Sequence, residues 1–331
     1  MRLSRRRFTT ATSLLLAAPF VVPGLAAAQT QATEIAEAAR AFPRLHSVLV
    51  QRGGEVVLAK SYRGPGLDRP ANIKSCSKSI VALLLGIAID RGEIPGVHAP
   101  LSEIAPDLVP RDATPGAGSI TVQDLVTMRA GLGATSGPEY GAWVASENWV
   151  AYALRRPMVG APGGRMIYST GSSHVLGAAL AKAVGDSLLT QARHRLGDPL
   201  GIDIPAWTRD PQGYYLGGNQ MALTPRAMLR LALLMRDGGR VDGTQVVSQD
   251  WVEASAQPRT VSPWSGLGYG YGWFLSDSGY RIARGYGGQV IAANPARDLA
   301  VAITSDPGEP ARSQGYFGEL MEFLDGPVLQ A

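Results

Sequence analysis

The segment "IKSCSKSIVALLLGIAIDRGEI", residues 73–94, places a serine and a lysine at the start of a long apolar run. The apolar side chains recur at helical spacing up to a closing glycine, so a helix is predicted over residues 75–92. Ser75 and Lys78 are three residues apart, which puts both side chains on one face of that helix. Lysine occurs only four times in the 331 residues, so its presence here is informative.

This pairing has a specific chemical meaning. A serine at a helix N-terminus lies near backbone N–H groups and the positive end of the helix dipole, which favour an oxyanion. A desolvated lysine can give up its proton near neutral pH, whereas an arginine cannot. A solvated surface lysine would instead oppose the dipole in the first helical turn. We therefore interpret Ser75 and Lys78 as an activated nucleophile and its partner.

A second element follows in "APGGRMIYSTGSSHVLG", where Tyr168 lies in a loop just before a predicted helix. A phenol has a pKa near 10 and is a poor base unless a cation lies beside it. Lys78 would be that cation. The alternative is that Tyr168 is an ordinary half-buried aromatic residue.

A third element is "ARGYGGQVIAANP", which we interpret as a glycine-rich strand. Gly287 and Gly288 would let a substrate backbone lie against this strand, because no side chain blocks the approach. The N–H of Gln289 would then pair with that of Ser75 as the two oxyanion donors. The alternative is a turn that enters a hairpin.

Taken together, these elements resemble the β-lactamase-related serine hydrolases. That family includes class C β-lactamases, D-alanyl-D-alanine carboxypeptidases, β-lactamase-fold esterases and nylon-oligomer hydrolases. Its three motifs occur in order as Ser75-Cys76-Ser77-Lys78, Tyr168-Ser169-Thr170 and Tyr286-Gly287-Gly288. The resemblance spans roughly residues 44–306, and three weak motifs in the correct order make one strong signal.

The order of predicted elements agrees with an α+β fold. Two apolar runs around Gly53-Gly54 predict a β-hairpin, and short β runs follow Pro263, with helices between them. We expect a β-lactamase/transpeptidase-like antiparallel sheet flanked by helices, with an inserted helical subdomain. The predicted boundaries are a catalytic domain at 29–331, with a sheet subdomain at 29–73 and 255–331 and a helical subdomain at 75–250.

Two departures from the family motifs bear on the substrate. Thr170 stands where many members have asparagine, and Tyr286 stands where β-lactamases and carboxypeptidases have lysine or histidine. That cation receives a substrate carboxylate, which Arg284, two residues earlier, could receive instead. We predict substrate contacts from Thr170, Arg284, Tyr286, Gly287 and Gly288.

The resemblance implies hydrolysis of an ester or amide through an acyl-enzyme on Ser75, with Lys78 and Tyr168 as base pair. Which of the two is the main base stays open. A β-lactamase, a D-alanyl-D-alanine carboxypeptidase and a slowly acylated penicillin- or peptide-binding protein are the alternatives. No cofactor and no metal are implied, and the expected partner is a small ester, amide or peptide.

The N-terminus, "MRLSRRRFTTATSLLLAAPFVVPGLAAAQT", predicts an export signal at residues 1–28. Ser4-Arg5-Arg6-Arg7-Phe8 resembles the bacterial twin-arginine signal, so a periplasmic or secreted protein is expected. Four basic residues lie in this segment, and the remainder is balanced at 27 basic against 27 acidic residues. Nucleic-acid binding is therefore not indicated, and no membrane span is expected in the mature chain.

The remaining reactive or aromatic residues are predicted to be structural. Cys76 is the only cysteine, which excludes an intrachain disulfide, and we expect a buried side chain. His174 is expected to be a packed helix residue, since no G-x-S-x-G segment indicates a Ser-His-Asp hydrolase. Four aromatic residues could line a substrate cleft or belong to the core: Trp264, Tyr269, Tyr271 and Trp273.

Overall fold

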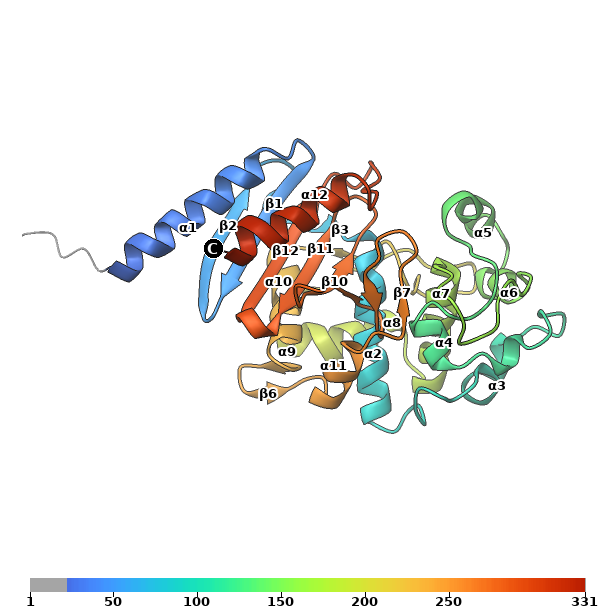
Figure 1. Cartoon of the computed structure of the whole chain (residues 1–331). Helices are drawn as coiled ribbons and strands as arrows, with labels where there is room; N and C mark the ends of the chain where they lie inside the picture. Colours follow the sequence, from blue (N-terminus) through green and yellow to red (C-terminus); the bar gives the residue numbers. More distant parts are fainter. Residues whose placement is uncertain (1–22, 331) are drawn as a thin grey trace, which may run out of the picture.

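The computed structural model describes residues 23–330, and its centre is one eight-stranded antiparallel sheet (Figure 1). The strand order is β2-β1-β12-β11-β10-β9-β8-β7. The N-terminal hairpin therefore lies beside the C-terminal strand β12, which joins the two ends of the chain in one sheet. The strands are β1 Leu45–Arg52, β2 Glu55–Ser61, β7 Thr260–Val261, β8 Gly268–Tyr269, β9 Phe274–Leu275, β10 Arg281–Arg284, β11 Val290–Asn294 and β12 Leu299–Ser305.

The two faces of the sheet bury different sets of side chains, because successive residues of a strand point to opposite faces. Val301 and Ile303 join one core with the helices α1 (Pro23–Arg40) and α12 (Tyr316–Phe323). Ala300 and Ala302 join the other core with α10 (Pro225–Arg236). The α+β fold class predicted from the sequence is confirmed, as is the hairpin around Gly53-Gly54.

The helical part of the chain contains most of the remaining elements. Its helices are α2 Ser77–Asp90, α3 Leu101–Ile104, α4 Val122–Val126, α5 Tyr140–Val144, α6 Trp149–Leu154, α7 Thr170–Val184, α8 Leu188–Ala192, α9 Asp198–Leu200 and α11 Gln249–Ser255. Short strands are β3 Ala71–Asn72, β4 Ala222–Leu223, β5 Arg240–Val241 and β6 Thr244–Gln245. Single 3-10 or π turns are η1 Lys74–Cys76, η2 Pro106–Leu108, η3 Ala117–Ser119, η4 Gly137–Glu139, η5 Arg193–Gly197, η6 Pro295–Arg297 and η7 Leu324–Val328.

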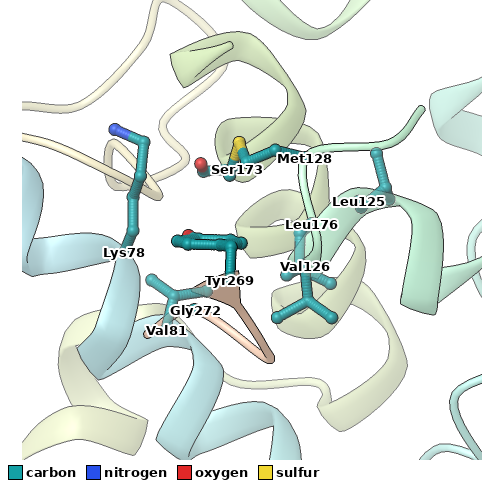
Figure 2. Close-up of a pocket in the computed structure, with 9 residues that line it drawn as sticks. All are labelled: Lys78, Val81, Leu125, Val126, Met128, Ser173, Leu176, Tyr269 and Gly272. Carbon is teal, nitrogen blue, oxygen red and sulfur yellow. The ribbon is translucent and has the colours of Figure 1, made fainter. Parts of the chain in front are cut away.

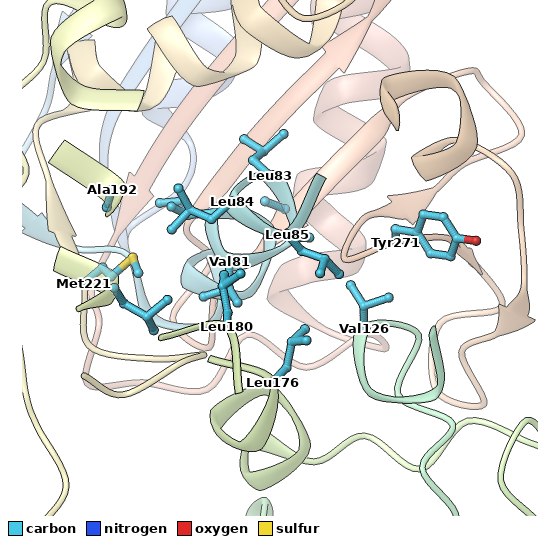
Figure 3. Packing of buried hydrophobic residues seen from close by; sticks show 14 of the residues in the cluster. Val81, Leu83, Leu84, Leu85, Val126, Leu176, Leu180, Ala192, Met221 and Tyr271 are labelled. Atoms are coloured by element: carbon cyan, nitrogen blue, oxygen red, sulfur yellow. The ribbon is translucent and has the colours of Figure 1, made fainter. Parts of the chain in front are cut away.

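Helix α2 is the central element of this region (Figure 3). Every residue from Ser77 to Ala88 is buried, as expected for a helix that is apolar on all sides. Figure 3 shows Val81 of α2 beside Leu180 of α7, and Leu85 on the side of Val126 and Tyr271. A side chain at Gly86 would overlap the Trp251 ring, so glycine permits the close approach of α11.

Two sequence-based predictions differ from the observed fold. Ser75 lies in the 3-10 turn η1, and the α-helix begins at Ser77, two residues later than predicted. Helix α10, assigned by sequence to the helical subdomain at 75–250, instead packs against β1, β11 and β12. The reason is its amphipathic pattern, which gives a polar outer face and an apolar face that fits the sheet.

The predicted export signal at residues 1–28 falls mainly on residues outside the described range. Within residues 23–330, none of the helices has both the length and the apolar character that crossing a bilayer would require.

Candidate active site

Ser75 lies at the junction between β3 and α2, and its residue is partly exposed. The preceding segment is held in place because β3 pairs with β4 and the Ile73 N–H donates to the Met221 carbonyl at 2.9 Å. Lys74 has a φ of +50°, a left-handed conformation that is costly for a residue with a side chain. The chain therefore turns sharply just before Ser75.

Lys78 is buried, with 4% of its surface exposed, and its ammonium nitrogen has three oxygen neighbours. Nζ lies 3.1 Å from Ser75 Oγ, 3.3 Å from Thr170 Oγ1 and 2.7 Å from the Gly218 carbonyl oxygen. No carboxylate of the described residues pairs with it. Burial lowers the pKa of Lys78 to about 7, so a neutral amine is available near neutral pH.

Tyr168 lies beside this pair. The Lys78 Nζ is 5.0 Å from the centre of the Tyr168 ring, and the phenol is hydrogen-bonded to Ser75. Burial raises the pKa of Tyr168 to about 12, and the hydrogen bond to Ser75 offsets this only in part. The expectation that Lys78 lowers the pKa of Tyr168 is wrong, because Lys78 is itself desolvated and is not a permanent cation. Burial therefore favours the neutral phenol of Tyr168 over the phenolate.

Thr170 begins helix α7 and contacts Lys78 in place of the usual asparagine. Its hydroxyl is also 3.0 Å from Ser136 Oγ, which in turn accepts the Thr170 backbone N–H at 2.9 Å. Ser136 is a site residue that the sequence reasoning missed. Its signal was weak: a serine just before the Gly-Pro pair that starts the 3-10 turn η4.

Residues 285–289 of the third motif form a turn between β10 and β11, which is the alternative that the sequence left open. Gly287 and Gly288 therefore do not lie in a strand, contrary to the prediction, and β11 begins at Val290. Strand β10 ends at Arg284, and a tight turn leads into β11. A Cβ at Gly287 would overlap the Asp306 carbonyl, and one at Gly288 would lie 2.6 Å from the Tyr316 ring. These glycines are thus explained by packing within the protein, and a direct contact with substrate stays a prediction.

The turn nevertheless lies against the nucleophile segment. A Cβ at Gly285 would lie 2.7 Å from the Ile73 carbonyl oxygen, so only glycine allows this approach. The buried Gln289 closes the turn: its Oε1 accepts the Gly287 N–H at 2.9 Å, and its Nε2 donates to the Ser305 carbonyl at 3.0 Å. The role of the Gln289 N–H as second oxyanion donor stays a prediction.

Cys76 follows the nucleophile and is fully buried, as predicted. Its Sγ lies 3.5 Å from the Gln289 carbonyl oxygen, and burial raises the pKa of the thiol. A buried thiol with a raised pKa is unreactive. Cys76 therefore does not compete with Ser75 as nucleophile.

Arg284 and Tyr286 do not share a strand face, contrary to the sequence-based expectation, because the strand ends between them. The Arg284 guanidinium donates to Ser313 Oγ at 2.9 Å and to the Ala311 carbonyl at 2.6 Å, and it lies 3.7 Å over the Phe317 ring. Burial lowers its pKa to about 10. Tyr286 lies in the turn with 54% of its surface exposed.

The aromatic residues divide between core and rim. Tyr269, Tyr271 and Trp273 are buried, whereas Trp264 is 59% exposed and meets the Tyr168 ring edge-on at 6.5 Å. Figure 2 shows Tyr269 beside the aliphatic stem of Lys78, in a small cavity that Ser173 also lines. Trp264 is therefore the one of the four aromatic residues that is placed to meet a substrate.

Comparison with known proteins agrees with this geometry. The family model described as Beta-lactamase matches residues 34–317. The chain belongs to the beta-lactamase family. A curated relative, the 6-aminohexanoate-dimer hydrolase of Paenarthrobacter ureafaciens, is 28% identical over 227 residues. That match covers 62% of this chain and 55% of the relative, so the chain spans about half of that protein's length.

Solved structures share the fold of this chain at low sequence identity. One is the hydrolase EstCE1, described as having promiscuous acyltransferase activity. Its TM-score is 0.75 at 18% identity, and the match covers 92% of this chain and 100% of EstCE1. A putative 6-aminohexanoate-dimer hydrolase from Bacillus anthracis has a TM-score of 0.72 at 16% identity, covering 87% of this chain and 78% of its own.

Proposed function

We propose that this beta-lactamase-family protein is a serine hydrolase that cleaves an ester or amide bond through an acyl-enzyme on Ser75. The observation that carries the proposal is the 3.1 Å contact between Lys78 Nζ and Ser75 Oγ, made by a buried lysine whose pKa is about 7. A neutral amine within hydrogen-bond reach of a hydroxyl is the arrangement that general-base catalysis requires.

In the proposed acylation step, neutral Lys78 accepts the proton of Ser75 as Oγ attacks the substrate carbonyl carbon. The resulting oxyanion would be held by the backbone N–H groups of Ser75 and Gln289. Tyr168, hydrogen-bonded to Ser75, donates its proton to the leaving group and recovers one from Lys78. The bond between the acyl carbon and the leaving group breaks, which leaves the acyl group on Ser75.

In the second step a water molecule attacks the acyl carbon, and its proton passes to the Lys78 and Tyr168 pair. Collapse of the tetrahedral intermediate returns that proton to Ser75 Oγ and releases the acid. The pKa values favour Lys78 as the main base and Tyr168 as the proton relay, because only Lys78 is close to neutrality.

We infer that the substrate is neutral near the scissile bond. The exposed rings of Tyr286 and Trp264 offer apolar surface with polar tips, whereas Arg284 already donates to Ser313 and Ala311. The relatives named as a dimer hydrolase and as the hydrolase EstCE1 support an amide or ester. Hydrolysis of penicillins and D-alanyl peptides is the weaker alternative.

The proposal is tested with p-nitrophenyl butyrate and a fluorophosphonate probe. We expect Ser75→Ala to abolish turnover and the probe adduct to map to Ser75 by mass spectrometry. Cys76→Ser is the matched control, since it changes the adjacent residue by one atom and should keep activity. Full activity in Ser75→Ala, or an adduct elsewhere, would refute the proposal.

The substrate class is tested by comparing kcat/KM for p-nitrophenyl butyrate and for a cephalosporin. We expect the ester to be preferred by at least about one decade, since a carboxylate would lack a charge-assisted partner. Arg284→Lys keeps a cation and serves as control for Arg284→Ala. A cephalosporin preference that disappears only in Arg284→Ala would identify Arg284 as a carboxylate anchor and contradict a neutral substrate.

We also propose that the protein is exported, on the basis of the N-terminal sequence alone. Replacing Arg5 and Arg6 together by lysine should retain the precursor inside the producing bacterium if the twin-arginine route is used. Unchanged export of this variant would show that another route operates.

A further inference from the structure

The shortest hydrogen bond of Lys78 is the one to the Gly218 carbonyl, at 2.7 Å. Gly218 lies in an irregular segment that precedes β4, outside any helix or long strand. The position of this carbonyl therefore depends on contacts made by neighbouring side chains. The contacts lead to a residue outside the catalytic motifs.

That residue is His174, about one turn into helix α7. Its Nδ1 lies 3.3 Å from the Gly217 backbone N–H, and its Nε2 lies 2.9 Å from Asp210 Oδ2. Because Nδ1 accepts a hydrogen bond from an N–H group, the ring proton is on Nε2 and is donated to Asp210. The other oxygen of Asp210 accepts the Tyr214 N–H at 2.8 Å.

The pair is closed off from water. The side chains of both His174 and Asp210 have no exposed surface, so the prediction that His174 is a packed helix residue is confirmed. The rings of Trp143 and Trp149 pack on the imidazole with centres 5.8 and 5.5 Å away. In such a site the carboxylate can bond only to the partners the protein supplies.

The segment that His174 holds also touches the stem of Lys78. A Cβ at Gly217 would overlap the Ser173 carbonyl oxygen, and a Cβ at Gly218 would lie 3.0 Å from Lys78 Cγ. The two glycines therefore let the segment lie directly on α7 and on Lys78. A small displacement of the Gly217 peptide would move the Gly218 carbonyl away from Nζ.

We propose that His174 and Asp210 are positioning residues for the base Lys78: Asp210 fixes the imidazole tautomer, and His174 Nδ1 fixes the peptide that presents the Gly218 carbonyl to Lys78. This inference rests on the proposed hydrolase function. Neither residue touches the substrate. If the two residues position Lys78, their replacement should change kcat and its pH dependence, whereas residues that only pack would change stability alone.

Asp210→Asn tests the proposal without a change of shape. The amide oxygen can keep the Tyr214 N–H, which leaves the NH₂ group to donate to His174 Nε2. The imidazole proton must then move to Nδ1, where it faces the Gly217 N–H, and two donors repel each other. We expect kcat for p-nitrophenyl butyrate to fall at least about tenfold, as for the loss of a buried hydrogen bond, with KM nearly unchanged.

Two further readouts separate positioning from simple destabilisation. The ¹⁵N NMR signals of His174 should show the exchanged tautomer. The fall of kcat/KM on the acid side of its pH profile, the acid limb, should move to lower pH. The Gly218 carbonyl stabilises the protonated form of Lys78, so losing this acceptor favours the neutral form. Two other groups also act on Lys78: Cys76 acts on it electrostatically, and the Tyr168 ring faces it. Both are unchanged in this variant.

Glu93→Gln is the matched control. It removes a carboxylate that Arg195 holds at 2.6 and 2.9 Å beyond the far end of α2, and it should leave the acid limb in place. If Asp210→Asn exchanges the tautomer but keeps kcat and the limb, the inference is overturned. Full activity in Lys78→Ala would instead overturn the proposed function itself.

A second pair of variants serves if Asp210→Asn does not fold. In His174→Asn the side-chain oxygen occupies the position of Nδ1 and can still accept the Gly217 N–H. In His174→Gln the amide reaches toward Asp210 and this acceptor is lost. We expect the asparagine variant to retain at least about tenfold more activity per folded molecule than the glutamine variant, and equal activities would overturn the inference.

Discussion

At the scale of single residues, the site shifts the pKa values of two neighbouring groups in opposite directions. Lys78 is desolvated without a carboxylate partner, so its pKa falls to about 7, while the pKa of Tyr168 rises to about 12. Burial acts on both, but it disfavours a cation in one and an anion in the other. In the proposed mechanism, the same physical cause therefore suits Lys78 to act as the base and Tyr168 to act as the proton donor near neutral pH.

The pH dependence of acylation follows from this separation. As pH rises through about 7, Lys78 loses its proton and becomes able to accept that of Ser75, so kcat/KM should rise and then level off. Lys78→Arg should lose at least about 10² in kcat/KM, because a guanidinium stays protonated. Stopped-flow release of nitrophenol between pH 5 and 9 measures both. A rate that falls with rising pH across 7 would contradict Lys78 as base.

At the scale of elements, the sequence predicted what local spacing controls. Ser75 and Lys78 were predicted because three residues along a helix fix a common face. The contact between Lys78 and Thr170 was not predicted, since threonine replaces the asparagine of the family motif there. Gly218 and Ser136 were missed because their contacts join residues far apart in the chain, and neither carries a local signal.

The turn after β10 shows why glycine is ambiguous in a sequence. Gly287 and Gly288 are compatible with an open strand and with a tight turn, and no property of the motif decides between them. The decision comes from packing against Asp306 and Tyr316, which are nearby in space through the return of β12 and the start of α12.

Gly285→Ala tests the contact between this turn and the nucleophile segment. The new Cβ would lie 2.7 Å from the Ile73 carbonyl oxygen, closer than real Cβ atoms approach, so the turn or the segment must shift. We expect kcat/KM to fall by at least about tenfold, because misplacement by 1 Å can cost as much as 10². Gly54→Ala, with no atom within 4 Å of its new Cβ, is the control that should stay active. Wild-type kinetics in Gly285→Ala would show that the turn does not position the site.

At the scale of the whole molecule, the sheet separates two hydrophobic cores, and different helices pack in each. The core that contains α2 and α7 also holds Lys78 and Thr170 at its edge, whereas the core under α1 and α12 lies on the opposite face of the sheet (Figure 1). The pairing of β1 with β12 brings α1, which precedes β1, and α12, which follows β12, into the second core. Tyr168 packs against this second core as well, so it is changes under α1 that should act on stability more than on catalysis.

Ile35→Ala makes this separation measurable. Ile35 is 1% exposed in α1 and packs in the second core, so its truncation removes apolar contacts and leaves a cavity. We expect the free energy of unfolding to fall by about 2 to 5 kcal/mol, with kcat/KM per folded molecule unchanged at 25 °C. Chemical denaturation and ester kinetics on the same preparation give both quantities.

The matched change in the first core is Leu84→Ala. Leu84 is also fully buried and lies in the helix that carries Lys78, so this variant should reduce stability and kcat/KM together. Equal losses of kcat/KM in the two variants would show that the cores are coupled through the sheet, because truncation on either face would then displace the catalytic residues.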